Sequence, residues 1–221
     1  MSADDLYTDE RRAILEAALI EADFDGFSLE TLRRASDKAG VSREMQRLAF
    51  PRGIMDLVAY YSRDADNAMV QGLKGYDLSA LKIREKIALA VRLRIEALAA
   101  HKPAARRAAQ FLALPQFAPE GLRNLYRTVD AIWRGIGDKS TDFNFYTKRV
   151  LLAGVYAATL MRWFEDQSED GRATWEFLDA RIENVMQIEK AKANARKIFA
   201  RVPSPLDALR RAREQTRPDR P

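Results

Sequence analysis

Apolar residues recur at the three- to four-residue spacing of an α-helix along almost the whole 221-residue chain. One such stripe lies in residues 8–22, and a longer one begins at Ile54. No stretch shows the strict alternation of apolar and polar residues that marks a half-buried strand. The sequence therefore predicts an all-α protein.

Turn and capping residues divide the first part of the chain into short helices. Ser28 is expected to cap a second helix that Gly40 ends, and Ser42 is expected to begin a third that stops near Pro51. Two short helices joined by such a turn have the length and the chemistry of a helix-turn-helix. We therefore expect a helix-turn-helix head over residues 1–53.

Longer helices are expected after the head. Ser79 is expected to begin one that has Ile83 on its inner side, and Pro103 and Pro119 suit the first turns of the next two. The helix that Pro119 opens carries an apolar stripe made of Leu122, Leu125, Val129, Ile132 and Trp133. These helices predict a second and larger hydrophobic core.

The last part of this core is expected to contain two more helices. An apolar helix follows a polar loop and covers about 145–166, and the final core helix begins within 168–172. We therefore expect a helical body over 54–187 and a separate tail over 188–221.

Few residues in the chain are suited to catalysis or to metal binding. There is no cysteine, and His101 is the only histidine, which excludes thiolate sites and sites with two imidazoles. We expect His101 to lie at the C-terminal end of a helix, where the helix dipole favours it. The carboxylates do not form the Glu-x-x-His pairs of a helical di-iron site, and no phosphate loop or nucleophile elbow is present. The sequence predicts no catalytic residue, no metal and no cofactor, and therefore no enzyme.

Hydropathy and the first residues bear on where the protein works. The most apolar run, 150–164, contains an arginine and is shorter than the about 20 residues that a bilayer span needs. The acidic first ten residues do not have the positive charge of a secretory signal or a transit peptide. We expect neither a membrane-spanning helix nor such a leader.

Charge is distributed unevenly along the chain. Residues 1–66 contain 9 Lys and Arg against 14 Asp and Glu, whereas residues 188–221 contain 10 against 4. A net negative head is repelled by DNA phosphates, although Arg43, Arg47 and Arg52 form a local basic excess. A ligand-controlled DNA-binding repressor therefore stays open as the alternative function.

Four segments of the sequence resemble one protein family. They are FDGFSLETLRRAS, LAFPRGIMDLVAYYSRDAD, DAIWRGIGDKSTDFNFYTKRVLLAGVYAATL and DQSEDGRATWEFLDARIENVM, in this order along the chain. They resemble the ninth Coq protein, a TetR-like, lipid-binding accessory protein of ubiquinone biosynthesis. The resemblance implies an apolar cavity for the isoprenoid tail of a quinone intermediate, which the protein presents to the di-iron demethoxyubiquinone hydroxylase without chemistry of its own. We expect the bound lipid to be such an intermediate or a phospholipid.

The resemblance also implies positions for two surfaces. The family's partner-facing patch corresponds to Ile132, Phe145 and Tyr146, with Phe145 in place of the usual tryptophan. For the cavity wall we expect large side chains of the body, namely Trp133, Leu151, Val155, Tyr156 and Trp175. Seen without the resemblance, the same apolar and small residues indicate ordinary helix packing, and a dimeric scaffold with a solid core is a further alternative.

The basic tail resembles a helix that lies in a membrane interface. Apolar residues fall on one side of it and cations cover much of the rest. The residues expected to contact the membrane are Lys192, Arg196, Lys197, Ile198, Phe199 and Arg201. A solvated tail is the alternative. We expect a homodimer, by analogy with the fold, on the cytoplasmic face of a bacterial inner membrane.

Overall fold

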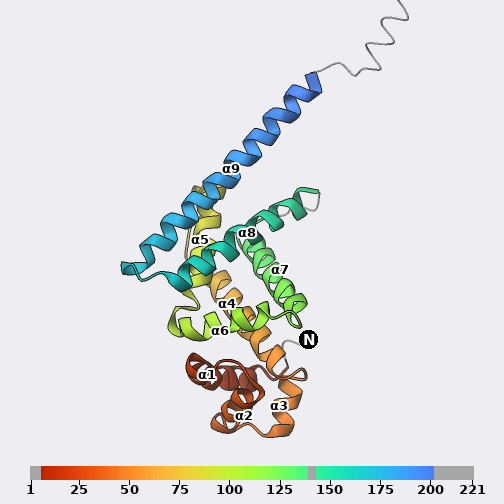
Figure 1. Cartoon of the computed structure of the whole chain (residues 1–221), viewed down its shortest axis with the longest axis vertical. Helices are drawn as coiled ribbons and strands as arrows, with labels where there is room; N and C mark the ends of the chain where they lie inside the picture. Colours follow the sequence, from red (N-terminus) through yellow and green to blue (C-terminus); the bar gives the residue numbers. More distant parts are fainter. Residues whose placement is uncertain (1–5, 139–142, 202–221) are drawn as a thin grey trace, which may run out of the picture. The chain divides into compact units, whose positions relative to one another are not determined.

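The protein consists of α-helices joined by short turns in the computed structural model (Figure 1), which describes the backbone of residues 6–138 and 143–201. The side chains of 143–144 and 188–201 lie outside the described part. The α-helices are α1 (Thr8–Asp25), α2 (Leu29–Lys38), α3 (Arg43–Ala49), α4 (Ile54–Leu73), α5 (Ile83–Glu96), α6 (Lys102–Ala113), α7 (Ala118–Gly135), α8 (Phe143–Glu165) and α9 (Arg172–Arg201). No strand occurs in these residues, and the all-α prediction is confirmed.

The first three helices form the expected head around a small core. Ser28 caps α2 by accepting a hydrogen bond from the Thr31 amide at 3.0 Å, and Ser42 caps α3 in the same way. Gly40, at φ +67°, makes the turn between them. Buried Arg11 of α1 donates from Nε to the Ala49 carbonyl at 2.9 Å and so fixes the end of α3. The predicted cap at Ser28 and the predicted start of the third helix at Ser42 are confirmed.

Helix α4 continues from the head into a body made of α5 to α8 (Figure 1). Its predicted core residues Leu57, Val58, Tyr61 and Ala65 are all buried. The core of the body thus begins on the same helix that leaves the head. No helix among the described residues is long and apolar enough to cross a bilayer.

Two details of the body differ from the sequence prediction. Helix α5 begins at Ile83 and not at Ser79, because the Asp77 carboxylate binds the amide and hydroxyl of Ser79 in a short 3-10 turn. Ile83 itself is 46% exposed. On α7, Leu122 is 68% exposed, although we expected it in the apolar stripe.

His101 connects the head to the body and, as expected, ends a helix, the short 3-10 helix Ala99–His101. It precedes α6, and its Nδ1 lies 2.9 Å from Oδ2 of Asp23 on α1. The other oxygen of Asp23 accepts the amide of Ala104 in the first turn of α6, also at 2.9 Å. One carboxylate of α1 therefore caps α6 and positions the histidine.

Two further contacts set the geometry around the body. Asp166, between α8 and α9, accepts hydrogen bonds from the amides and hydroxyls of Ser168 and Thr174. These bonds lower the pKa of Asp166.

Helices α6 and α7 approach so closely that a Cβ on Gly121 would lie 2.8 Å from the Leu112 carbonyl oxygen. By contrast, a Cβ on Gly154 of α8 would meet no atom within 4 Å.

Helix α9 belongs to two compact units of the chain, residues 1–179 and residues 180–221. The expected boundary between body and tail, at 187/188, lies within this helix. Residues 202–221 are outside the described part, and so are the side chains of the six residues expected to contact the membrane. The membrane surface and the three-part division of the chain stay predictions.

Candidate functional site

The body contains an apolar pocket of about 370 Å³ between α4, α5, α6, α7 and α8. This volume lies within the range of small-molecule sites. Most of its wall consists of alanine, leucine and aromatic side chains. The lining residues are Val58, Tyr61, Ser62, Arg94, Leu98, Ala105, Ala108, Ala109, Leu112, Ala113, Gly121, Asn124, Leu125, Thr128, Tyr156, Ala157, Leu160 and Met161.

The pocket opens between α6 and α8. Met161 is 50% exposed, whereas Tyr156, one and a half turns earlier on α8, is only 5% exposed. Met161, Ala109 and Ala113 also line a neighbouring surface groove of about 460 Å³ that continues to Arg106. A chain-like apolar ligand could therefore enter the pocket and extend along this groove.

A buried ion pair lies at the inner end of the pocket. Arg94 of α5 donates from Nε to Oδ1 of Asp66 on α4 at 2.5 Å, and the two side chains are 3% and 9% exposed. Thr128 of α7 donates its hydroxyl to the same oxygen at 2.9 Å, and Arg94 also donates to the Ser62 carbonyl at 3.1 Å. Burial raises the pKa of Asp66, against the lowering effect of Arg94 and Thr128. These bonds connect α4, α5 and α7 around the pocket.

Only Tyr156 of the five expected wall residues lines this pocket. Its ring lies 5.9 Å from the Arg94 guanidinium, and burial raises the pKa of its phenol. Trp133 packs instead under Lys148 near the start of α8, and Trp175 stacks on Arg92 and donates to the Asp170 carbonyl.

The remaining two expected wall residues, Leu151 and Val155, lie on α8 but not at the pocket. The prediction for these four side chains needs correction, because a large apolar side chain can serve packing as well as a cavity wall. The actual wall uses small residues of α6, which the sequence analysis did not select.

The three expected partner-facing residues lie at very different depths. Tyr146 is 63% exposed, and its ring contacts the partly exposed ring of Phe145 edge-on at 5.1 Å. Ile132 is fully buried in α7, so it cannot touch a partner directly and that assignment is corrected. Ile132 lies in the core, on the helix α7 that packs against α8, which carries Phe145 and Tyr146.

The Lys148-Arg149 dipeptide explains how the aromatic pair is held. Arg149 is 3% exposed and binds Asp130 on α7 with Nε at 2.9 Å, while its guanidinium lies 3.4 Å from the centre of the Phe145 ring. Lys148 binds Asp138 at 3.1 Å. The two cations thus fix the start of α8 to α7 and to Asp138, which follows α7, and Tyr146 is exposed on this anchored part of α8.

An exposed apolar stripe on α8 was missed by the sequence analysis. Val150 is 72% exposed and follows Tyr146 by four residues, and exposed Gly154 follows by four more. The same helical face continues to Ala157 and Met161 at the pocket mouth. Tyr146 and Met161 are fifteen positions apart on the helix, a rise of about 22 Å. The spacing was visible in the sequence, but exposure could not be told from burial.

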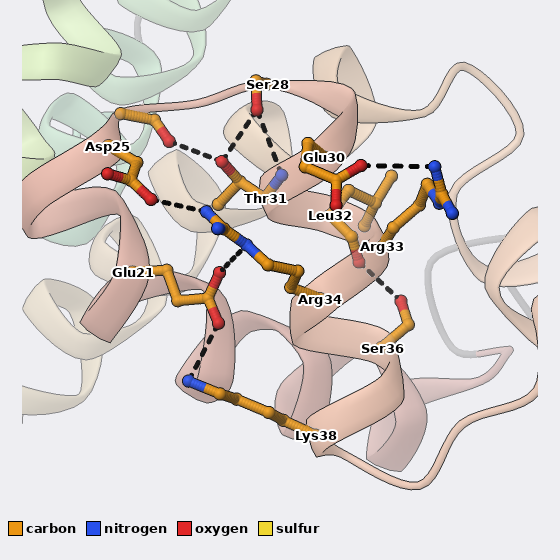
Figure 2. Close-up of polar contacts among 11 residues, drawn as sticks. Glu21, Asp25, Ser28, Glu30, Thr31, Leu32, Arg33, Arg34, Ser36 and Lys38 are labelled. Carbon is orange, nitrogen blue, oxygen red and sulfur yellow. Dashed lines mark hydrogen bonds and ion pairs between the residues drawn. The ribbon is translucent and has the colours of Figure 1, made fainter.

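Four basic residues of the head form ion pairs with carboxylates. Figure 2 shows Arg34 bound to Glu21 and Asp25, at 2.8 and 2.5 Å, and Lys38 bound to Glu21 at 2.8 Å. Arg33 pairs with Glu30 at 3.2 Å (Figure 2). Arg52, which we counted in the local basic excess, is held by Asp56 and Glu120. These four cations are therefore less able to neutralise DNA phosphates than unpaired ones.

Comparison with known proteins agrees with the arrangement of head and body. A TetR transcriptional regulator from Nitrosomonas europaea superposes with a TM-score of 0.64 over 79% of this chain and 97% of that chain, at 21% sequence identity. The expected TetR-like fold is therefore confirmed. At this identity the likeness concerns the fold alone.

Sequence relatives point to one family. The mitochondrial ubiquinone biosynthesis protein COQ9 of Drosophila melanogaster is 30% identical over 81% of this chain and 56% of its own length. The COQ9 of Homo sapiens is also 30% identical, over 79% of this chain and 57% of its own length. The COQ9 of Rattus norvegicus is 46% identical over 82 residues, which are 37% of this chain and 26% of that protein. The chain thus spans about half the length of the first two.

The names of these relatives also correct one expectation. All three are mitochondrial proteins by name, which contradicts the expected bacterial cytoplasm and points to mitochondria. The COQ9 family model matches residues 118–189, from the first turn of α7 into α9. The resemblance drawn from the sequence is confirmed, because the matching family model and these relatives all belong to the COQ9 family.

Proposed function

We propose that the chain is a non-catalytic accessory protein that binds an isoprenoid quinone intermediate and presents it to the demethoxyubiquinone hydroxylase. The observation that carries the proposal is the apolar pocket, whose mouth lies on the same face of α8 as exposed Tyr146 and Val150. A ligand that leaves the pocket past Met161 emerges on the helix face that carries the aromatic pair. Binding and presentation thus use one continuous apolar surface.

The composition of the two ends of this surface fits their two roles. The pocket wall has four alanines from α6, which leave room for an apolar chain. The outer end has a large, exposed aromatic ring on a base held by buried Arg149. Exposed aromatic residues on rigid supports are typical anchors of protein interfaces.

The basic stretch over 188–221 supplies the third part of the proposal. Its excess of six positive charges suits an anionic bilayer, where each cation near the surface contributes about 1 kcal/mol. We propose that this stretch holds the protein at the membrane in which the quinone intermediates dissolve.

The test is a pair of substitutions that separate lipid binding from partner binding. Ala157→Trp fills the pocket wall, and we expect its purified protein to yield no lipid by organic extraction and mass spectrometry, while hydroxylase binding persists. Tyr146→Asp places a charge on the exposed patch, and we expect at least tenfold weaker hydroxylase binding with normal lipid content.

Matched controls decide the outcome. Val150→Trp adds the same ring to α8 outside the pocket and should retain lipid, and Tyr126→Asp replaces a half-exposed tyrosine on α7 and should retain the partner. Circular dichroism checks that all four variants fold. Lipid-free wild-type protein that also fails to bind lipid vesicles refutes the carrier role, and equal affinity of Tyr146→Asp refutes the patch.

A further inference from the structure

Three polar side chains at the inner end of the pocket have hydrogen-bonding atoms without a partner in the described part of the chain. They are Nη1 of Arg94, both amide atoms of Asn124 and the hydroxyl of Tyr61. All three side chains line the pocket and are at most 6% exposed. A buried polar group is costly if it stays unsatisfied, so three of them in the lining of one apolar pocket point to a ligand.

The same groups define the hydrogen-bonding chemistry of that ligand. Arg94 can only donate, Asn124 offers both a donor and an acceptor, and Tyr61 can do either. Burial raises the pKa of Tyr61, so the phenol keeps its proton. A head group that satisfies this set carries at least one acceptor oxygen, such as a carbonyl, and accepts or donates through a second oxygen.

The charge of the site selects against an ionic head. Among the described residues, Arg94 is the only charged one in the pocket lining, and its charge is already balanced by Asp66 at 2.5 Å. A phosphate or carboxylate would add a second negative charge without a second cation, and a buried charge without a partner is costly. The balanced pair favours an uncharged head.

We infer that the ligand enters head first, with an uncharged ring bearing oxygen atoms bound by Arg94, Asn124 and Tyr61 and its isoprenoid chain directed to the mouth. This inference rests on the proposed lipid-binding function and adds the orientation and the head group. The pocket of about 370 Å³ accommodates the ring and the first part of the chain, and the adjoining groove past Met161 receives the rest. The ring is thereby kept from solvent until it is drawn out along α8.

The inference is tested with three probes that share one short isoprenoid chain. The chain ends in a benzoquinone, in a methyl group or in a phosphate, and binding to lipid-stripped protein is measured by calorimetry. We expect the quinone to bind at least tenfold more tightly than either of the others. In Asn124→Leu the affinity for the quinone probe should exceed that for the methyl-ended probe by less than threefold, while the affinity for the methyl-ended probe stays unchanged. The control Asn67→Leu, at an exposed position of α4, should change neither affinity.

The orientation of the bound quinone is tested by its rate of reduction. With protein in excess, the bound quinone should be reduced by dithionite at least tenfold more slowly than the free quinone, because its ring is buried. Equal binding of quinone and methyl-ended chain, preference for the phosphate, or reduction at the rate of the free quinone overturns this inference alone. Failure of all three probes to bind overturns the proposed lipid-binding function as well.

Discussion

Removing the guanidinium of Arg94 leaves a carboxylate without its cation in the interior of the body. The Asp66 side chain is 9% exposed, and only the Thr128 hydroxyl would still bind the oxygen that Arg94 now holds. Breaking a buried ion pair by removal of one partner costs about 3–5 kcal/mol. We therefore expect Arg94→Leu to lower the free energy of unfolding by this amount at neutral pH.

The pH dependence of that loss has a definite sign. Burial already raises the pKa of Asp66 above its ordinary value, and removing Arg94 raises it further. The folded variant then binds a proton more tightly than the unfolded chain, so its stability rises as the pH falls through the raised pKa. The difference between Arg94→Leu and the wild type should accordingly shrink in acid.

Urea unfolding followed by circular dichroism measures these changes, on lipid-stripped protein because a bound ligand adds stability by mass action. Arg94→Leu combined with Asp66→Leu should recover at least half of the loss, since no unpaired charge remains. The control is Arg92→Leu, which removes an exposed ion pair with Glu96 and a ring contact and should cost about 1 kcal/mol or less. A double variant no more stable than Arg94→Leu, or a single variant as stable as the wild type, refutes the reasoning.

Three further predictions concern packing, capping and the tail. Gly121→Ala should lower stability by about 1–2 kcal/mol in thermal unfolding, because its Cβ meets a carbonyl oxygen at 2.8 Å, whereas Gly154→Ala should raise it by about 0.5–1 kcal/mol. Asp166→Ala should cost about 1 kcal/mol at neutral pH through lost capping. Because the folded pKa of Asp166 is lowered, this cost should disappear as the pH falls below the ordinary aspartate pKa of about 4 and through the folded value, in a pH series of urea unfolding. The double variant Lys192→Glu and Arg196→Glu should bind anionic vesicles more than tenfold more weakly at low salt in a sedimentation assay. Its binding to neutral vesicles should not change.

Local chemistry explains which parts of the fold could be predicted from the sequence. The cap at Ser28, the helix start at Ser42 and the proline in the first turn of α6 depend on residues within one turn, so they were identified correctly. The start of α5 was wrong because the side chain of Asp77 competes for the amide of Ser79. A competing turn of this kind is equally local, and the Asp-x-Ser spacing was a usable signal.

The role of His101 depended on a contact that no local pattern contains. Its partner Asp23 lies 78 positions earlier in the chain, on α1. Sequence periodicity places a residue on a face of its own helix, but it does not say which other helix covers that face. The same reason explains why Ile132, on a strongly amphipathic helix, was assigned to a surface that it lies beneath.

The polar end of the pocket shows this limit most clearly. On α7 the fully buried Ile132 is preceded at four-residue steps by Thr128, Asn124 and Glu120, all of them buried. A prediction that counts only apolar residues follows the buried face back to Val129 and then leaves out the polar positions. It selects Leu122 in their place, although Leu122 is exposed to solvent. Polar residues in register with an apolar stripe are therefore a signal in their own right. Because burying them is unfavourable without partners, they mark the place where another helix, as Asp66 does for Thr128, or a ligand completes the site.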